Sequence, residues 1–268
     1  MKKILALMLV LLMCTLTFVA CSKDEADNTL TCGVTIFENM NEQDEDGNWT
    51  GFETEFAEAV AEILGMKAEF QIIDWNQKYN ELNSGAIDCI WNGFTANSTD
   101  KVEGIDTKRS DLVDFSYGYM LNQQCIVVKT DNLATVTSVE DLAGKTACVE
   151  GGSAGASYAA TVTDEDKIFS TTAQINAFTE VKSGAADFAV VDIILAKNIC
   201  GKGDYTDLAI VDAIELDSEI YAIGFKKGSD LTAKVNDAIK TLNENGKLLE
   251  LAKKYGFENV LNVTETIE

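Results

Sequence analysis

The sequence contains Ser84-Gly85-Ala86-Ile87-Asp88-Cys89-Ile90-Trp91-Asn92 and, at an offset of 99 residues (84 to 183), the similar stretch Ser183-Gly184-Ala185-Ala186-Asp187-Phe188-Ala189-Val190-Val191-Asp192. In each copy a helical stretch ends at a glycine, which tolerates the left-handed turn that closes a helix. A short apolar run follows, as in a buried parallel strand, and ends on a polar residue. Since open α/β sheets bind ligands beyond the carboxyl ends of their strands, Asn92 and Asp192 are predicted to face one small molecule from two similar lobes.

Around these copies, the apolar pattern predicts alternating strands and helices. From 53 to 64 apolar residues recur at helical spacing, and Gly65 follows as a stop. A long polar stretch at 95–110 has no predicted element. The expected strands are 30–37, 68–73, 86–91, 124–129, 145–149 and 220–226, and the expected helices are 53–64, 76–84, 138–142, 231–242 and 247–254.

The order of these elements predicts an α/β protein in which one lobe is inserted into the other. The mature chain is longer than one core usually supports, which favours two lobes. We assign 30–121 and 222–268 to lobe one, and 122–221 to lobe two. The chain crosses between them near 120–123 and 219–222, and two crossings form a hinge on which lobes can close.

The first 20 residues resemble a bacterial lipoprotein signal. A basic start at Lys2 and Lys3 precedes an apolar run at 4–12, which is too short to span a bilayer, and Cys21 follows Ala20. Cleavage before Cys21 and its lipidation would anchor the protein to a membrane face through a flexible tether at 21–29. An ordinary secretory signal cut nearby is the alternative, and either signal exports the protein.

The charge balance limits the partners. The net charge is −23, and loss of the two signal lysines makes it −25. Such a chain repels nucleic acid and anionic lipid, so neither is expected as a ligand. A cationic ligand is permitted, although the acidic residues are dispersed along the chain, as is typical of a solubilising surface. We expect a monomer.

The residue types also limit the chemistry. The sequence has no histidine, which removes the usual base of nucleophilic triads and the commonest zinc ligand. It has no P-loop or dinucleotide motif, so we expect no cofactor and no metal site. Of seven cysteines, the five beyond Cys21 are expected to be mostly buried free thiols, with Cys32 and Cys89 the favoured pair if one disulfide forms.

A glycine-rich turn at 150–155 (EGGSAG) joins an expected strand to a helix. The first turn of a helix offers free backbone N–H groups and the positive end of the helix dipole to an anion. Small residues there let a ligand approach the backbone. The turn is therefore a candidate site for a carboxylate.

Several segments, in this order, resemble the extracytoplasmic solute-binding proteins, family 3, that deliver polar amino acids to ABC importers. The resemblance covers almost all of the mature chain and implies a two-lobed periplasmic-binding-protein-like fold, with a mixed, mostly parallel sheet in each lobe and two hinge strands. It is carried by Gly51 to Ala57 (GFETEFA), Asn92 to Thr95 (NGFT), Arg109 to Ser116 (RSDLVDFS), Val139 to Lys145 (VEDLAGK), Gly152-Ser153, Asp192 and Asn245 to Lys247 (NGK).

The resemblance and the chemistry of an amino acid assign the same roles. Arg109 would grip the ligand carboxylate in fork geometry, and Ser153 would add N–H groups. Asp192 would pair with the ammonium. Each has a plainer alternative, since Arg109 could be a surface ion pair, and Asp192 or Ser153 a simple helix cap. The other candidate ligand-binding residues are Phe37, Glu38, Asn92, Gly93, Thr95, Gly152 and Ala154.

The chain departs from the family pattern before Arg109. About nine extra residues, around 98–106, separate Arg109 from the segment at 92–95, so Lys101 and Lys108 are alternative cations. Trp91 is expected in the core. Glu38 suggests a polar or cationic ligand side chain, and arginine, lysine, ornithine, glutamine and cystine all suit the backbone site.

The sequence therefore predicts a lipid-anchored, non-enzymatic receptor that binds a polar L-amino acid and hands it to ABC permease subunits. Two other functions use the same fold. A dehydratase-like or lytic transglycosylase-like enzyme would need an acid or base in the cleft, for which only Glu38, Glu150 and Asp192 are available. A ligand-sensing domain would need a signalling module.

Overall fold

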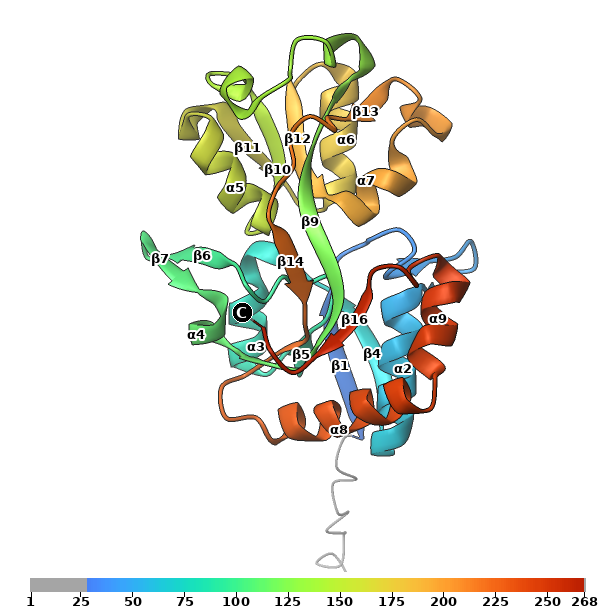
Figure 1. Cartoon of the computed structure of the whole chain (residues 1–268). Coiled ribbons are helices and arrows are strands. Elements are labelled where there is room, and N and C mark those ends of the chain that lie inside the picture. The colour runs from blue at the N-terminus through green and yellow to red at the C-terminus, as the bar shows by residue number, and fades with distance from the viewer. Residues whose placement is uncertain (1–27, 268) are drawn as a thin grey trace, which may run out of the picture.

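Two separate sheets, each flanked by helices, form two lobes of the molecule (Figure 1). The structure is a computed structural model and describes residues 28–267. The α/β class and the two lobes agree with the prediction. The sheets are mixed but not mostly parallel as expected, because the strands that cross or return between the lobes pair antiparallel with their neighbours. The proposed signal, Cys21 and most of the tether lie outside the described residues, and the lobe boundaries stay a prediction. Within the described part, no helix has both the length and the apolar character that a membrane span requires.

The sheet of lobe one has five strands. Its order is β4 (Lys67–Ile72), β1 (Thr29–Val34), β5 (Cys89–Ile90), β15 (Gly224–Phe225) and β8 (Asp114–Phe115). β4 and β5 run parallel to β1, whereas β15 is antiparallel to its neighbours. The helices of this lobe are α2 (Phe52–Leu64), α3 (Lys78–Ser84), α4 (Arg109–Leu112), α8 (Asp230–Glu244) and α9 (Lys247–Tyr255).

The other sheet has seven strands and is built on β9 (Gly118–Lys129). Its path is β11 (Ile168–Thr171), β10 (Ala147–Glu150), β12 (Phe188–Asp192), β9 and β13 (Leu208–Ile210), while β14 (Ser218–Tyr221) and β16 (Leu261–Thr264) pair with β9. Helices α5 (Ala154–Val162), α6 (Gln174–Ser183) and α7 (Ile193–Ile199) flank this sheet.

β9 runs from one lobe into the other (Figure 1). Its first half pairs antiparallel with β14, from Met120 opposite Tyr221 to Gln123 opposite Ser218, and its second half pairs with β12 and β13. The two predicted crossings are therefore adjacent strands of one ladder. The strand expected at 124–129 is the second half of this longer strand, and the polar residues Asn122 and Gln123 stand just before the predicted start.

The repeated stretch forms the same local structure twice. Gly85 ends α3 and Gly184 ends α6, both in the left-handed conformation, with φ of 81° and 86°. β5 and β12 follow, and the polar residues just beyond β5 and at the end of β12, Asn92 and Asp192, are buried. Trp91 lies in the core, edge-to-face on Phe56.

The polar stretch before Arg109 contains a β-hairpin, β6 (Thr99–Val102) and β7 (Ile105–Lys108), that the sequence did not predict. Its two-residue turn, Glu103-Gly104, has positive φ at both positions, as type I′ turns require. Both strands are mostly exposed, so they lack the alternation of a half-buried strand. A shorter hairpin joins β2 (Glu42–Gln43) and β3 (Trp49–Thr50).

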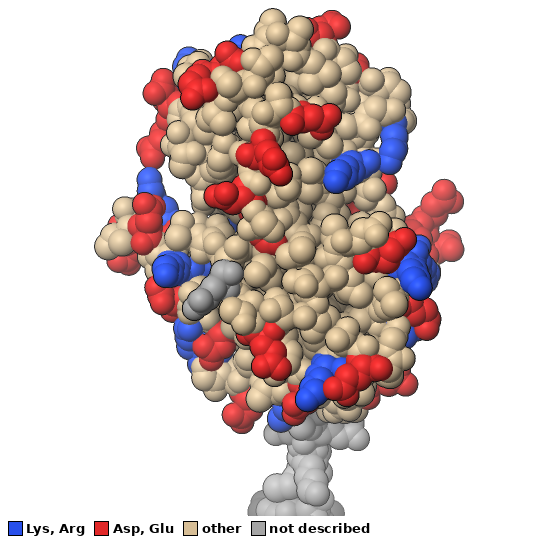
Figure 2. Space-filling view, in the orientation of Figure 1, with Lys and Arg blue, Asp and Glu red and all other residues tan. Residues whose placement is uncertain are grey.

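The cysteines and the surface charge agree with the composition. Cys32 and Cys89 lie opposite each other on β1 and β5 with sulfurs 3.7 Å apart, and all five described cysteines are free. Figure 2 shows acidic side chains scattered over both lobes with basic ones between them, as expected of a solubilising surface.

Candidate functional site

A cavity between the lobes brings the ends of β5, β10 and β12 together. Its volume is about 10 Å³, enough for about one water molecule. An amino acid can therefore enter only when the lining residues move apart. Lobe one contributes Trp75, Asn92, Gly93, Thr95 and Arg109, and the other lobe contributes Gln124, Glu150, Ser153, Ala154, Gln174 and Asp192.

All the buried charged side chains among residues 28–267 gather at this cleft. Each lines the cavity or bonds to a residue that does, except Lys78, whose Nζ lies 5.5 Å from the ring of Trp75, a cavity-lining residue. They comprise two cations, Lys78 and Arg109, and five carboxylic acids, Glu53, Asp100, Glu150, Asp192 and Glu219. Because a buried charge is costly without a partner, such a concentration favours a binding site over a purely structural core.

Arg109 is the sequence's single arginine, and it is 1% exposed at the start of α4. Its Nε and Nη2 lie 3.0 and 2.9 Å from Asp100 Oδ1, and Nη1 donates to the Thr95 carbonyl at 3.0 Å. The Phe94 ring lies 4.9 Å from the guanidinium carbon. Burial opposes the charge, yet Asp100 raises the pKa of Arg109. Arg109 is therefore not part of a surface ion pair. The nearby acid Asp114 pairs with Lys227.

Lys78 is a second buried cation at this point, and sequence reasoning missed it. Its Nζ lies 3.0 Å from Asp100 Oδ2 and donates to the Gly152 carbonyl at 2.8 Å. Burial, followed by the charge of Arg109, lowers the pKa of Lys78 to about 8. The same two cations hold the pKa of Asp100 below its usual value against the effect of burial. Two cations and one carboxylate leave one positive charge, which suits one ligand carboxylate.

The glycine-rich turn lies opposite these cations. Ser153 caps α5, where its Oγ accepts from Ala156 N–H at 3.0 Å, and it also lines the cavity. A Cβ on Gly155 would lie 2.5 Å from the Val190 carbonyl oxygen, so only glycine fits there. Ser153 is thus a cap whose helix start faces the cleft.

Asp192 precedes α7 but makes no capping hydrogen bond within the described chain. Its Oδ1 accepts from Asn122 Nδ2 and Gln124 Nε2, both at 2.6 Å, and Oδ2 accepts from Gln174. A carboxylate has about four acceptor positions, so Asp192 keeps one for a further donor. Burial raises the pKa of Asp192.

Glu219 shares the donors of Asp192. Its Oε2 accepts from Asn122 at 2.6 Å, from Gln124 at 3.0 Å and from Thr95 Oγ1 at 3.2 Å. Burial, followed by the charge of Asp192, raises the pKa of Glu219 to about 7. The amides therefore bridge two carboxyl groups that would otherwise repel each other.

Glu53 and Glu150 complete the set of carboxyl groups. Gly93 N–H donates to both oxygens of Glu53, at 2.9 and 3.1 Å, and Tyr119 donates to Oε1. Burial raises the pKa of Glu53 to about 7. Glu150 is 3% exposed, and its Oε1 has no hydrogen-bond partner among the described residues.

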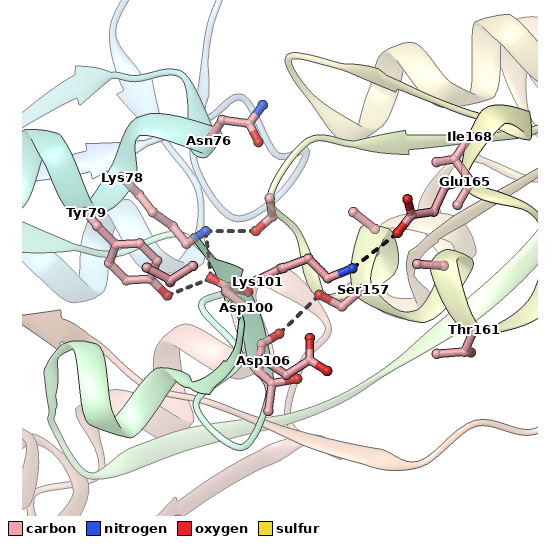
Figure 3. Close-up of a pocket in the computed structure, with 15 residues that line it drawn as sticks. Asn76, Lys78, Tyr79, Asp100, Lys101, Asp106, Ser157, Thr161, Glu165 and Ile168 are labelled. Carbon is pink, nitrogen blue, oxygen red and sulfur yellow. Dashed lines mark hydrogen bonds and ion pairs between the residues drawn. The ribbon is translucent and has the colours of Figure 1, made fainter. Parts of the chain in front are cut away.

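A second and larger cavity lies beside the cleft, between the β6–β7 hairpin and α5 (Figure 3). Its volume is about 620 Å³. Two contacts from the hairpin cross it between the lobes, since Ser157 Oγ donates to the Thr99 carbonyl at 3.1 Å and Lys101 Nζ lies 3.2 Å from Glu165 Oε1. Lys101 is exposed there and does not line the cleft cavity, and neither does Lys108.

The structure brings most of the predicted site residues together. Around the cleft cavity lie Asn92, Gly93, Thr95, Arg109, Ser153, Ala154 and Asp192. Three predicted residues do not line it. Phe37 is buried against Gly93, Glu38 is half-buried, and the Gly152 carbonyl accepts from Lys78. Their contact with a ligand stays a prediction.

Besides Lys78, sequence reasoning missed Trp75, Asn122, Gln124, Gln174 and Glu219. A signal was present for two of them. Asn122 and Gln124 are two residues apart in β9, so both point to one face, and a polar pair on a strand otherwise rich in apolar residues indicates a wet face. Lys78 and Glu219 are brought to the site by folding alone.

Comparison with known proteins decides the family. Residues 30–259 match the profile of the bacterial extracellular solute-binding proteins, family 3. The chain belongs to this family. It is 30% identical to the arginine-binding extracellular protein ArtP of Bacillus subtilis (strain 168), over 95% of this chain and 98% of that protein, and 27% identical to the L-cystine-binding protein TcyJ of Escherichia coli (strain K12), over 80% and 76%.

Solved structures of similar proteins share its fold. An ancestral arginine-binding protein bound to arginine is 31% identical, with a TM-score of 0.75 over 85% of this chain and 98% of that one. A substrate-binding protein of an ABC uptake transporter from Streptococcus pneumoniae, with bound histidine, is 29% identical, with a TM-score of 0.76 over 90% and 97%. The predicted family and its two-lobed periplasmic-binding-protein fold are confirmed.

The site combines opposite charges. Arg109 and Lys78 share Asp100 and leave one positive charge beside the start of α5, whereas Asp192 and Glu219 share the amides of Asn122 and Gln124. This arrangement complements a zwitterion. Within residues 28–267, no group of three or more potential metal ligands lies close enough to hold an ion.

Proposed function

We propose that this protein binds a free L-amino acid between its lobes and delivers it, unchanged, to the permease subunits of an ABC importer. One observation carries the proposal: Arg109 and Asp192, which suit the two charged ends of an amino acid, line the same interlobe cavity. Because the ligand touches both lobes, it favours the closed state, which is the signal that a receptor of this kind can give a permease.

Each end of the ligand has a defined partner in the proposal. Arg109 and Lys78, with one net positive charge after pairing with Asp100, attract the α-carboxylate, and the start of α5 at Ser153 adds N–H groups. Asp192 uses its remaining acceptor position for the α-ammonium. We also propose lipidation of Cys21, which would keep a monomeric receptor at the outer face of the membrane.

An enzyme on this fold is the competing function. One similar structure is that of an ancestral amino acid-binding protein, AncCDT-1, described as a precursor of cyclohexadienyl dehydratase, at 28% identity and a TM-score of 0.71. That protein is itself an amino acid-binding protein. We favour binding without turnover here, since the buried carboxyl groups, apart from Glu150, are engaged by amide or hydroxyl donors or by cations that orient them for recognition.

Titration calorimetry with a panel of L-amino acids tests the proposal, together with mass spectrometry of the ligand recovered after incubation. We expect at least one amino acid to bind and to be recovered intact. Arg109→Gln should weaken it by about 100-fold or more, as loss of a buried charge-assisted contact costs about 3 kcal/mol or more. Lys240→Gln, which removes an exposed charge on α8, should have no effect.

Two results would reject the proposal. The first is an affinity for amino acids that Arg109→Gln leaves unchanged while thermal unfolding shows an intact fold. The second is conversion of the ligand into a product. Arg109→Lys, which keeps the charge but loses the planar fork, should give an intermediate loss.

A further inference from the structure

Glu150 is the buried carboxyl group of the cleft that is least satisfied. It ends β10, is 3% exposed and lines the cavity, and its Oε1 has no hydrogen-bond partner among the described residues. A buried acceptor without a partner costs about 1–3 kcal/mol, so a strand end is a poor place for it unless something binds there. The cavity beside it is where a ligand enters.

The groups that face Glu150 come from both lobes. Asp192 approaches from the end of β12, Lys78 from α3, Arg109 from α4, and the Thr35 hydroxyl from the residue beyond β1. Lys78 and Arg109 are already paired with Asp100. Their one remaining positive charge is available to the ligand carboxylate, and the strongest charge effect on Glu150 is the negative one of Asp192.

The buried charged groups of the whole cleft also have a negative excess. Five buried carboxyl groups, three of which burial keeps partly protonated near pH 7, stand against two cations. A zwitterion with a neutral side chain leaves this excess as it is, whereas a ligand with one further positive charge reduces it. Trp75 also lines the cavity, and an indole face attracts a cationic side chain.

We propose that Glu150 is a specificity-determining residue that selects amino acids whose side chain carries a positive charge. The proposal rests on the proposed function and names the substrate class of the same site. The Glu150 carboxylate accepts from the ammonium or guanidinium at the end of the ligand side chain, while Arg109 and Asp192 hold the ends common to all amino acids.

Protonation provides an independent readout. Burial, followed by the charge of Asp192, raises the pKa of Glu150 to about 8, so the carboxyl group is largely protonated at pH 7 before a ligand binds. A cationic side chain favours the carboxylate and displaces this proton into solvent. The affinity for a cationic ligand relative to a neutral one therefore rises between pH 6 and pH 8, since loss of charge on Lys78 near pH 8 weakens both ligands alike.

L-Arginine and L-citrulline provide the test, because they have nearly the same shape and differ by one charge. Calorimetry at pH 7, in buffers of different ionisation enthalpy, measures both affinity and proton release for the wild type and for Glu150→Gln. We expect the wild type to prefer arginine by about 100-fold and to release a proton on binding it. Glu150→Gln should reduce this preference at least tenfold, mainly by weakening the binding of arginine, and should abolish the release of the proton.

Glu215→Gln is the matched control, since Glu215 is an exposed glutamate between β13 and β14. It should behave as the wild type. Equal wild-type affinity for arginine and citrulline, or a preference that survives Glu150→Gln, overturns the inference and leaves the proposed function standing. A wild type that binds no amino acid overturns both. The wild-type pH profile keeps the test decisive if the variant does not fold.

Discussion

Asp100 Oδ1 lies 2.9 Å from Arg109 Nη2, and both residues are buried at the junction of the lobes. The β6–β7 hairpin supplies this carboxylate, and its other oxygen accepts from Tyr79 at 2.6 Å and pairs with Lys78. An arginine predicted to hold a ligand carboxylate thus already holds one from the protein itself. Asp100 keeps two cations buried side by side without excess charge.

Asp100→Asn should destabilise the fold. Removal of one partner from a buried ion pair costs about 3–5 kcal/mol, because the remaining charge stays buried. We expect a lower melting temperature in the absence of ligand, and a larger rise on adding an amino acid than in the wild type, because the ligand carboxylate then supplies the missing negative charge. Differential scanning calorimetry with and without ligand measures both.

Asp106→Asn is the control for this prediction, because Asp106 is an exposed acid of the same hairpin. It should melt as the wild type. If Asp100→Asn melted normally and showed an unchanged ligand response, Asp100 would have no part in the charge balance of the site.

The hairpin should also hold the lobes together. The contacts of Ser157 with Thr99 and of Lys101 with Glu165 break when the cleft opens (Figure 3). One hydrogen bond and one exposed ion pair together contribute about 1–2 kcal/mol. Removing both by Ser157→Ala and Lys101→Ala should therefore raise the ligand dissociation rate by about 5- to 30-fold.

Stopped-flow fluorescence can follow this rate through Trp75, which lines the cleft. The association rate should change much less. Thr161→Ala is the control. Thr161 lines the larger cavity between the hairpin and α5, but it bonds to Tyr158 within its own helix. A double variant with the wild-type dissociation rate would mean that the hairpin does not restrain opening.

Stability should fall as the pH rises from about 4.5 to 8. Burial raises the pKa of Glu53 from its ordinary value of 4.5 to about 7 in the folded protein. The folded state therefore keeps a proton that the unfolded state releases, and the stabilisation present below pH 4.5 is lost as the pH passes 7. Burial also raises the pKa values of Glu150 and Glu219, so these two groups change the stability in the same direction.

Glu53→Gln should flatten this dependence, so that the variant gains several degrees of melting temperature relative to the wild type between pH 5 and pH 8. Melting curves across this range provide the measurement, and Glu258→Gln, at an exposed site, should keep the wild-type slope. A slope unchanged by Glu53→Gln would show that this carboxyl group is ionised throughout.

Local sequence patterns predicted much of the site. Arg109, Ser153 and Asp192 each follow or begin a regular element, and a parallel strand order places such residues at one edge. The sequence did not predict the hairpin, because mostly exposed strands lack an alternation of apolar and polar residues. The sequence did not predict the role of Lys78 either, because an isolated lysine on a short helix is usually exposed. In the structure, the opposite lobe buries it.

The sequence by itself determined the elements, their order and the family, because helix stops, apolar periodicity and the repeated strand ends are properties of neighbouring residues. Only the tertiary structure decided which charges meet. Lys78, Asp100 and Arg109 come together within lobe one from α3, the hairpin and α4, and Glu150 and Asp192 come together at the strand ends of the other lobe. Electrostatic energy in a buried site depends on distance and desolvation between residues far apart in the chain, and no local pattern encodes either.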